Sequence, residues 1–331
     1  MKAVSHLLLM PPNWIGDAIM AQPAMRAICE YHIRHCHTEQ ISMCGRPWLN
    51  DLLPYLDLPE TTYQETIPRA DMAFLFPNSF RSALQCRQAG ISQLIGYRGQ
   101  WRKLLLSKPL PHRIRLKHEH HRRFYLDIPA QLDIPVAQTE VRLCIPGQTR
   151  AAAHESMQQH GLNPKQVICI APGAQFGAAK CYPAKGYNTV VQRLAESGWQ
   201  PIILGMPEDK EFGRIILQNI VTPHWNAAGE TSLAEALQLI SASRLMLCND
   251  SGLMHVAAGM GIPTVTPFGA TDPERTSPSG PHVRVIYQPA DCSPCLQREC
   301  TVPGHPCMAN ISPTMLLDAC LAMLESDTKP A

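Results

Sequence analysis

Three short segments place reactive side chains where an apolar, strand-like run gives way to a helical pattern. In the first, "PPNWIGDAIMAQPAMRAI", Asp17 follows Gly16 directly at the start of the expected helix. A carboxylate that a rigid turn holds in a partly solvated position can act as a general base. It can equally cap the helix, because carboxylates accept backbone N–H bonds and complement the helix dipole. The residues alone leave both roles open.

The second segment, "CIAPGAQFGAAKCYPAKGY", leaves its strand at Pro172-Gly173 and reaches Lys180 through small residues. Glycine and alanine let an anion approach their backbone N–H groups closely, and a lysine adds a point charge. We therefore expect this loop to bind a phosphate, although the P-loop pattern G-x-x-x-x-G-K-[ST] is absent. The alternative is an ordinary surface lysine.

The third segment, "CNDSGLMHVAAGMGIPTVTPFG", has Asp250, Ser251 and Gly252 before a helix and His255 one turn further on. Free N–H groups at a helix N-terminus, at the positive end of its dipole, suit a pyrophosphate. Asp250 could accept hydrogen bonds from sugar hydroxyls, and His255 could donate to a phosphate oxygen or a leaving group. The alternative is an aspartate that caps the helix beside a histidine satisfied within it.

Strand-length apolar runs alternate with helical patterns along the chain. The runs include "AVSHLLLM", "DMAFLF", "QVICIA", "QPIILG", "RLMLCN", "PTVTPF" and "HVRVIY". This alternation predicts parallel sheets in two doubly wound α/β domains that face one another across a cleft, with ligands beyond the carboxyl ends of the strands. We place the domains at residues 1–160 and 161–331, and the last helix, near 313–326, could pack back on the first domain.

Composition narrows the class of protein. The net charge is +2 and charged residues are 17% of the chain, so charge-driven recognition must be local and no nucleic-acid partner is expected. No apolar run approaches the roughly 20 residues that span a bilayer, and the start does not resemble a signal peptide. The chain has thirteen cysteines, an odd number scattered along it, which favours reduced thiols and a cytoplasmic protein.

Six ordered blocks resemble glycosyltransferase family 9, the ADP-heptose:lipopolysaccharide heptosyltransferases. They are "NWIGDAIMAQPAMRA", "FPNSFRSAL", "GYRGQWR", "APGAQFGAAKCYP", "AAGETSLAEALQLI" and "NDSGLMHVAAGMGIPTVTPFGATDPERTSP". The similarity covers nearly the whole chain, and the combination of "PNSFRSAL" with "PGAQFGAAK" is most similar to the heptosyltransferase II branch. It implies the GT-B fold, in which a first Rossmann-like domain binds the acceptor and a second binds the ADP-sugar.

The resemblance also implies a reaction in lipopolysaccharide core biosynthesis of Gram-negative bacteria. L-glycero-D-manno-heptose would pass from ADP-heptose to the first heptose of the inner core, with inversion and without a metal or cofactor. The nearest alternative in the family is transfer to another core acceptor, as by heptosyltransferases I and III. Because inversion needs attack from the face opposite the leaving ADP, the base and the donor belong on different domains.

The resemblance assigns individual residues to this reaction. Asp17 matches the proposed catalytic base of the family, and Lys180 is expected to bind the donor and to aid departure of ADP. The donor residues that it implies are Gly173, Ala174, Gln175, Lys180, Glu208, Thr231, Asp250, Ser251, Gly252 and His255. Family members often show Lys-Arg-Trp-Pro where this chain has Lys180-Cys181-Tyr182-Pro183, so any phosphate contact by that arginine is missing here.

A basic stretch follows the first block of motifs. Residues 96–123 contain nine Lys or Arg and four His against one acid, Glu119. Such runs are often solvated surface or nucleic-acid patches, but the resemblance favours a grip on the carboxylates and phosphates of inner-core lipopolysaccharide. The acceptor residues that we predict are Asn78, Ser79, Arg81, Arg98, Arg102, Arg122 and Arg123. The same stretch could hold the protein peripherally on the anionic cytoplasmic leaflet of the inner membrane.

Four cysteines lie close together near the C-terminus. In "CSPCLQRECTVPGHPC", Cys292, Cys295, Cys300 and Cys307 fall within sixteen residues. They could form a structural zinc site, remain free thiols or form disulfides, and His305 is a spare ligand. We expect no catalytic role for them.

Two other functions compete with sugar transfer. A nicotinamide-dependent oxidoreductase would fit the βαβ pattern, but it needs G-x-G-x-x-G after the first strand, which is absent. A non-catalytic, basic nucleic-acid-binding protein would use the basic stretch with a zinc knuckle. It needs aromatic residues for stacking on bases, and aromatic residues make up only 6% of the chain.

Overall fold

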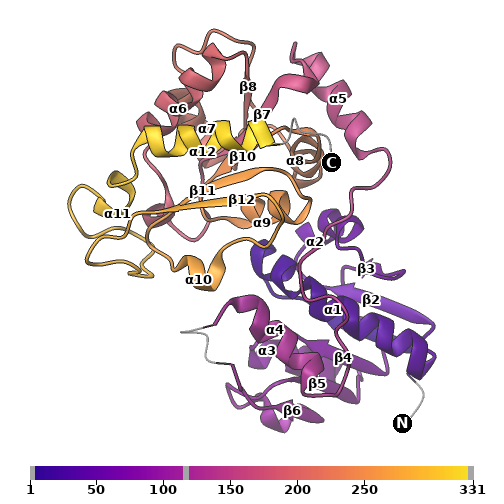
Figure 1. Cartoon of the computed structure of the whole chain (residues 1–331). Helices are drawn as coiled ribbons and strands as arrows, with labels where there is room; N and C mark the ends of the chain where they lie inside the picture. The colour runs from indigo at the N-terminus through magenta and orange to yellow at the C-terminus, as the bar shows by residue number, and fades with distance from the viewer. Residues whose placement is uncertain (1–3, 115–118, 327–331) are drawn as a thin grey trace. The chain divides into compact units, whose positions relative to one another are not determined.

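A computed structural model describes residues 4–114 and 119–326, and it divides the chain into the compact units Met1–Cys144 and Ile145–Ala331 (Figure 1). The predicted domain boundary at residue 160 is therefore wrong. Helix α5 (Thr149–Gln159), which lies before that boundary, packs against α8 (Leu233–Ala242) of the second unit. Arg150 Nε donates to the Ser241 carbonyl at 3.0 Å. These contacts explain why the division falls before α5.

The first unit is built on six parallel strands in the order β3-β2-β1-β4-β5-β6. The strands are β1 (His6–Met10), β2 (Gln40–Cys44), β3 (Thr62–Gln64), β4 (Met72–Leu75), β5 (Gln93–Tyr97) and β6 (Lys108–Leu110). Leu7, Leu8 and Leu9 of β1 are fully buried, as is typical of a strand with both faces of its sheet covered.

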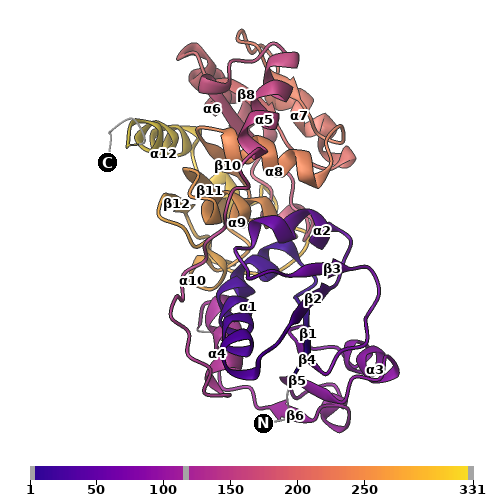
Figure 2. The ribbon, with the colours of Figure 1, turned by 90° about the vertical axis from the view of Figure 1, so that its right-hand side faces the viewer.

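The helices of the first unit are α1 (Ile15–Cys36), α2 (Trp48–Leu52), α3 (Phe80–Gln88) and α4 (His121–Ala130), with 3-10 turns η1 (Leu53–Tyr55) and η2 (Arg102–Leu104). Helices α1 and α4 lie side by side in both ribbon views (Figures 1 and 2). This pairing brings side chains from the end of the basic stretch next to the start of α1.

The second unit repeats the architecture, with six parallel strands in the order β12-β11-β10-β7-β8-β9. The strands are β7 (Val167–Ala171), β8 (Gln200–Ile203), β9 (Trp225–Asn226), β10 (Met246–Cys248), β11 (Thr264–Phe268) and β12 (Val283–Tyr287). Its other helices are α6 (Ala184–Glu196), α7 (Lys210–Ile216), α9 (Gly252–Gly259), α10 (Pro273–Thr276), α11 (Pro306–Ala309) and α12 (Pro313–Ser326), with 3-10 turns η3 (Pro164–Gln166), η4 (Ala178–Lys180) and η5 (Pro207–Asp209).

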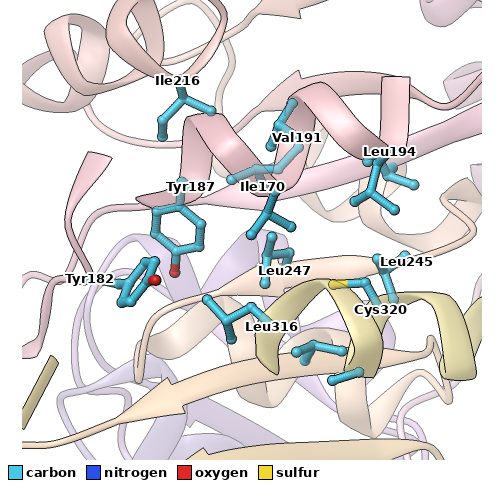
Figure 3. Packing of buried hydrophobic residues seen from close by; sticks show 14 of the residues in the cluster. Ile170, Tyr182, Tyr187, Val191, Leu194, Ile216, Leu245, Leu247, Leu316 and Cys320 are labelled. Atoms are coloured by element: carbon cyan, nitrogen blue, oxygen red, sulfur yellow. The ribbon is translucent and has the colours of Figure 1, made fainter. Parts of the chain in front are cut away.

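The core of the second unit includes the last helix. Figure 3 shows Leu316 and Cys320 of α12 near Leu245 and Leu247 of the β10 segment, with side chains of α6 in the same cluster. Helix α12 packs against α6, β11 and β12. The apolar residues of the last helix therefore complete the core of the second unit, and its packing on the first domain stays a prediction.

The seven apolar runs singled out from the sequence are all strands, and both sheets are parallel, as predicted. Numbered from its own first strand, each sheet has the order 3-2-1-4-5-6. In such sheets the strand order reverses between the first and fourth strands, and the carboxyl ends of these two strands form the crevice that binds ligands. This topology predicts the crevice of the first unit after β1 and β4, and the crevice of the second unit after β7 and β10.

Candidate functional site

Asp17 lies in the first turn of α1, directly after β1. The N-cap of this helix is Trp14, and no side chain caps it. The capping alternative for Asp17 is therefore wrong, although its position still lets the helix dipole favour a negative charge. Its side chain is 26% exposed, which leaves one part of the carboxylate open to a substrate hydroxyl.

Two side chains of α4 meet this carboxylate. The Tyr125 hydroxyl donates to Asp17 Oδ1 at 3.0 Å, and His121 Nδ1 lies 3.7 Å from the same oxygen. Burial raises the pKa of Tyr125 well above its usual value, and the negative charge of Asp17 raises it further. The phenol therefore stays protonated and serves as a fixed donor that orients the Asp17 carboxylate.

Neither of these side chains was predicted from the sequence as part of the site. His121 and Tyr125 are four residues apart, so a helix places them on one face. That spacing was the signal that could have found them, but the histidine was counted only as part of a basic run. Nothing in the local sequence indicates that α4 packs beside α1.

Arg102 has a different role from the one predicted. Its side chain is fully buried, and its donors reach the Pro77 carbonyl, the Tyr97 carbonyl at 2.6 Å and Asn78 Oδ1 at 3.0 Å. Burial lowers the pKa of this guanidinium to about 10. The prediction that Arg102 binds the acceptor is wrong, because its side chain donates its hydrogen bonds to Asn78 and to backbone carbonyls at the ends of β4 and β5.

The other predicted acceptor residues lie around the same loops. Asn78 is held by Arg102, and Ser79 caps α3 by accepting from Ser82 N at 3.2 Å. Arg81 and Arg98 are exposed. These four residues therefore lie on or beside loops that leave the carboxyl ends of β4 and β5, where an acceptor could bind.

Arg122 and Arg123, at the start of α4, are each paired with an acid. Arg122 makes a bidentate pair with Glu140, in which Nη2 donates to Oε1 at 2.8 Å, and Arg123 Nη1 donates to Glu119 Oε2 at 2.5 Å. An acceptor would have to compete with these carboxylates. Residues 115–118 of the basic stretch lie outside the described part of the chain.

In the second unit, Lys180 and Asp250 form a buried ion pair at the ends of β7 and β10. Lys180 Nζ lies 2.6 Å from Asp250 Oδ2, and the two side chains are 13% and 5% exposed. Thr271, which follows β11, also donates to Asp250 Oδ2 at 2.6 Å. Lys180 is therefore not an ordinary surface lysine. Asp250 is not the helix cap, because that position belongs to Ser251.

Ser251 has a buried hydroxyl that makes no hydrogen bond within the described part of the chain. It precedes α9, whose N-terminus begins at Gly252, and His255 lies buried on the same helix. A buried polar atom without a partner is uncommon and needs an explanation. A ligand oxygen bound at the N-terminus of α9 would provide the missing hydrogen-bond partner of the Ser251 hydroxyl.

Asn249 ties the two loops of this crevice together. It is fully buried, and its Nδ2 donates to the Pro172 carbonyl. Its Oδ1 accepts from Tyr182 N at 3.1 Å and from the Tyr187 hydroxyl at 2.7 Å. The loop after β7 and the strand end of β10 are thereby fixed to each other.

The loop at Gly173 leaves no room for a side chain. A Cβ at Gly173 would lie 2.3 Å from Asp209 Oδ2, and Asp209 accepts from Met206 N at 2.9 Å. Burial raises the pKa of Asp209. Glu208, the neighbour that was predicted from the sequence, is exposed, whereas the carboxylate of Asp209, which was not predicted, packs against this loop.

The remaining residues that were predicted to bind the donor lie on the loop of Gly173 or on neighbouring segments of the second unit. Ala174 and Gln175 continue the loop from Gly173, and Thr231 donates to the Ala227 carbonyl at 3.3 Å. Burial raises the pKa of the Cys181 thiol to about 11, and Asp209 contributes to this rise. Cys181 is therefore a neutral thiol, and it cannot replace a phosphate-binding arginine.

The C-terminal cysteines do not form a recognisable metal site. Among the described residues, no group of three or more His, Cys, Asp or Glu side chains is arranged to hold a metal ion. Cys292 is exposed, Cys295 and Cys300 are half-buried, and Cys307 is buried with a free thiol. The zinc site stays a prediction without geometric support.

Together these features define a two-domain α/β protein of the GT-B fold, with reactive groups at the crevice of each sheet. A model of glycosyltransferase family 9 (heptosyltransferase) matches residues 65–305, and the chain belongs to this family. Lipopolysaccharide heptosyltransferase 2 of Escherichia coli K12 is 29% identical to this chain. The matched region covers 96% of this chain and 98% of the E. coli protein.

Two further comparisons bear on the branch of the family. The solved structure of E. coli ADP-heptose lps heptosyltransferase II is 27% identical in sequence and superposes with a TM-score of 0.80. The superposition covers 99% of this chain and 100% of the E. coli chain. Lipopolysaccharide heptosyltransferase 1 of Pseudomonas aeruginosa is 27% identical over only 44% of this chain. The similarity to the heptosyltransferase II branch extends over the full length, as the sequence motifs predicted.

Proposed function

We propose that this chain transfers L-glycero-D-manno-heptose from ADP-heptose to the first heptose of the lipopolysaccharide inner core, as heptosyltransferase II does. The observation that carries the donor half is the crevice after β7 and β10. There, Lys180 and Asp250 lie close to a buried Ser251 hydroxyl at a helix N-terminus, and this hydroxyl has no hydrogen-bond partner among the described residues. Such a site suits a diphosphate that is linked to a sugar.

In the proposed reaction, the acceptor hydroxyl attacks the anomeric carbon on the face opposite the departing ADP. Asp17 takes the hydroxyl proton while the bond from the anomeric carbon to the diphosphate oxygen breaks, and ADP leaves with the bonding electrons. The anomeric configuration is inverted. Tyr125 holds the Asp17 carboxylate in position for this transfer through its 3.0 Å hydrogen bond.

Lys180 and the N-terminus of α9 stabilise the charge that develops on the departing diphosphate. Because the chain itself supplies this positive charge, we propose a transfer that requires neither a metal ion nor another cofactor. Asp250 would then exchange part of its contact with Lys180 for hydroxyl groups of the sugar. The exposed Glu208 and the half-buried Thr231 remain candidates for the nucleoside end of the donor.

The decisive test is the mass of the product. Purified protein is incubated with ADP-heptose and with core acceptors that carry no heptose, one heptose or two heptoses. We expect one heptose to be added to the mono-heptosylated core alone, with release of ADP. Addition only to the heptose-free core or only to the two-heptose core would assign the chain to another branch of the family. No addition to any core would overturn the proposed function.

We also propose that the first unit contacts the inner membrane from the cytoplasmic side. No helix within the described ranges is long and apolar enough to cross a membrane. Trp101 and Leu104 are 88% and 87% exposed, and the exposed Lys103 lies between them. Exposed aromatic and aliphatic side chains beside cations favour the interface of an anionic bilayer.

Vesicle binding tests this contact. The wild-type protein should co-sediment with vesicles that contain phosphatidylglycerol and less with neutral vesicles. Replacing Trp101 and Leu104 with serine should weaken the binding while transfer to a soluble, truncated core stays unchanged. Equal sedimentation of the wild type and this variant would contradict the assignment.

A further inference from the structure

The cysteine-containing segment lies directly on the loop that carries Lys180. The backbone N–H of Ala179 donates to the Arg298 carbonyl at 3.0 Å, and His305 Nε2 lies 3.0 Å from the Ala179 carbonyl oxygen. Gly177 has φ = 153°, and a Cβ there would lie 2.1 Å from the Arg298 carbonyl oxygen. The backbone of residue 298 is therefore fixed against the loop of residues 172–181, which carries Lys180 and is called the donor loop below. Only glycine at 177 permits this close approach.

One aromatic ring of the donor loop contacts two cations. Lys180 Nζ lies 4.9 Å from the centre of the Phe176 ring, and Arg298 Cζ lies 5.3 Å from the same centre. Both distances fall within the range in which a cation is attracted to the face of an aromatic ring. Phe176 therefore holds the guanidinium of Arg298 beside the loop that carries Lys180.

The charges of these two cations are not equally available. Lys180 is paired with Asp250 at 2.6 Å, so this pair brings little net charge to the crevice. The side chain of Arg298 is exposed, and within the described ranges it forms no ion pair and no hydrogen bond. The diphosphate bridge of a nucleotide sugar carries two negative charges, and it needs positive charge beyond that of a neutralised pair.

We propose that Arg298 binds the diphosphate of the nucleotide-sugar donor, as a second cation beside Lys180. This inference rests on the proposed function, since it names a further residue for the same donor site. A guanidinium suits the position, because its planar fork can donate two parallel hydrogen bonds to phosphate oxygens while its face stays on Phe176. The segment 292–307 thus supplies a donor ligand in addition to any structural role of its cysteines.

Calorimetry with ADP and with adenosine tests this role in the full-length protein. Arg298→Ala should weaken the binding of ADP about 10- to 100-fold, the loss expected for one charge-assisted, bidentate contact. Binding of adenosine, which has no phosphate, should not change. Arg193→Ala is the matched control, because Arg193 is an exposed arginine on α6 that pairs with Glu196, and it should leave both affinities unchanged.

A purely structural role of Arg298 makes a different prediction. If the guanidinium only props Phe176, then Arg298→Ala should lower the melting temperature, and ADP and adenosine should lose affinity to the same small extent. Arg298→Lys keeps the charge but loses the fork, and we expect it to recover part of the ADP affinity, whereas Arg298→Gln should recover none. Equal ADP affinity for the wild type and Arg298→Ala, or equal recovery by Lys and Gln, would overturn the inference.

The failure of this inference is distinguishable from a failure of the proposed function. If the wild-type protein does not bind ADP and does not transfer heptose, the proposed function itself is wrong. If the wild type binds ADP and transfers heptose but Arg298→Ala does both equally well, only the role of Arg298 is wrong. The KM for ADP-heptose should rise in Arg298→Ala in proportion to the loss of ADP affinity.

Discussion

In the first unit, the crevice of the sheet holds Asp17, a carboxylate that contacts a tyrosine and a histidine. In the second unit, the crevice at the equivalent strands holds Lys180 and Asp250, an ion pair beside a helix N-terminus. The strand order is the same in both sheets. The sheet therefore decides where a site can form, and the residues of the loops decide which charged groups lie there.

The two crevices also share a way of fixing their loops. Each has one fully buried polar side chain, Arg102 in the first unit and Asn249 in the second, that bonds to backbone groups beyond the strand ends. Both side chains bond to the carbonyl of a proline that follows a central strand, Pro77 or Pro172. A loop held in this way can place a reactive side chain without the flexibility that an exposed loop usually has.

The largest expected effect is that of Asp17→Asn, which would separate the chemistry of the two crevices. The amide can still accept the hydrogen bond from Tyr125 but cannot take a proton, so kcat should fall about 10²- to 10⁴-fold. The affinity for ADP should stay within about twofold, because the donor is assigned to the second unit. Steady-state rates and calorimetry check this, and near-normal turnover would remove Asp17 as the base.

The next effect concerns stability in the first unit. His32 of α1 is buried, and its Nδ1 has no hydrogen-bond partner among the described residues. Burial lowers the pKa of this histidine to about 4. The unfolded chain binds a proton below about pH 6.5 whereas the folded chain does not, so stability is lost as the pH falls from 6.5 towards 4. The upper limit of this loss is about 3 kcal/mol of unfolding free energy.

Denaturation at several pH values tests the effect, with His32→Leu as the variant. Leucine is apolar and similar in volume, so the variant should show a flatter dependence of unfolding free energy on pH between 6.5 and 4. Activity at neutral pH should not change, since His32 packs on Phe74 in the core. An unchanged pH dependence would show that His32 already titrates normally in the folded protein.

A smaller effect, a loss of affinity for ADP, is expected for Lys180→Met, which breaks the ion pair of the second crevice. The affinity for ADP should fall about 10- to 100-fold, because a charge contact is lost and the buried Asp250 repels the diphosphate. The variant should also be less stable, since it leaves a buried carboxylate unpaired. The double variant Lys180→Met/Asp250→Asn should recover stability without recovering ADP affinity. Recovery of both would mean that Lys180 only neutralises Asp250.

The smallest effect is that of Tyr125→Phe, which removes the donor to Asp17. We expect kcat to fall about tenfold, the value of one oriented hydrogen bond to a charged group. In the Asp17→Asn background the same change should have little further effect, because the two residues act together. Tyr97→Phe is the control, since the Tyr97 hydroxyl donates to the Phe124 carbonyl and Asp127 and should affect stability but not kcat. An equal loss in both backgrounds would contradict the coupling.

Much of the architecture could be predicted from the sequence, because buried parallel strands are continuous apolar runs and the reactive residues follow them directly. Asp17, Lys180 and Asp250 were predicted as site residues for this reason, and the structure places them at the strand ends of their sheets. Arg102 was misassigned because nothing in a basic run shows which arginine turns inward. Tyr125 was missed because its partner Asp17 is 108 residues away in the chain. The boundary was placed too late because the packing of α5 on α8 is a tertiary contact without a local signal.

The central claim is that the crevice of the second unit binds the diphosphate and that the first unit supplies the base. Hydrogen–deuterium exchange with and without saturating ADP tests it most directly. We predict slower exchange in peptides that cover residues 172–181 and 248–256, and in the peptide that contains Arg298, with little change around Asp17. Protection that is confined to the peptides around Asp17, with none at the ends of β7 and β10, would contradict the account.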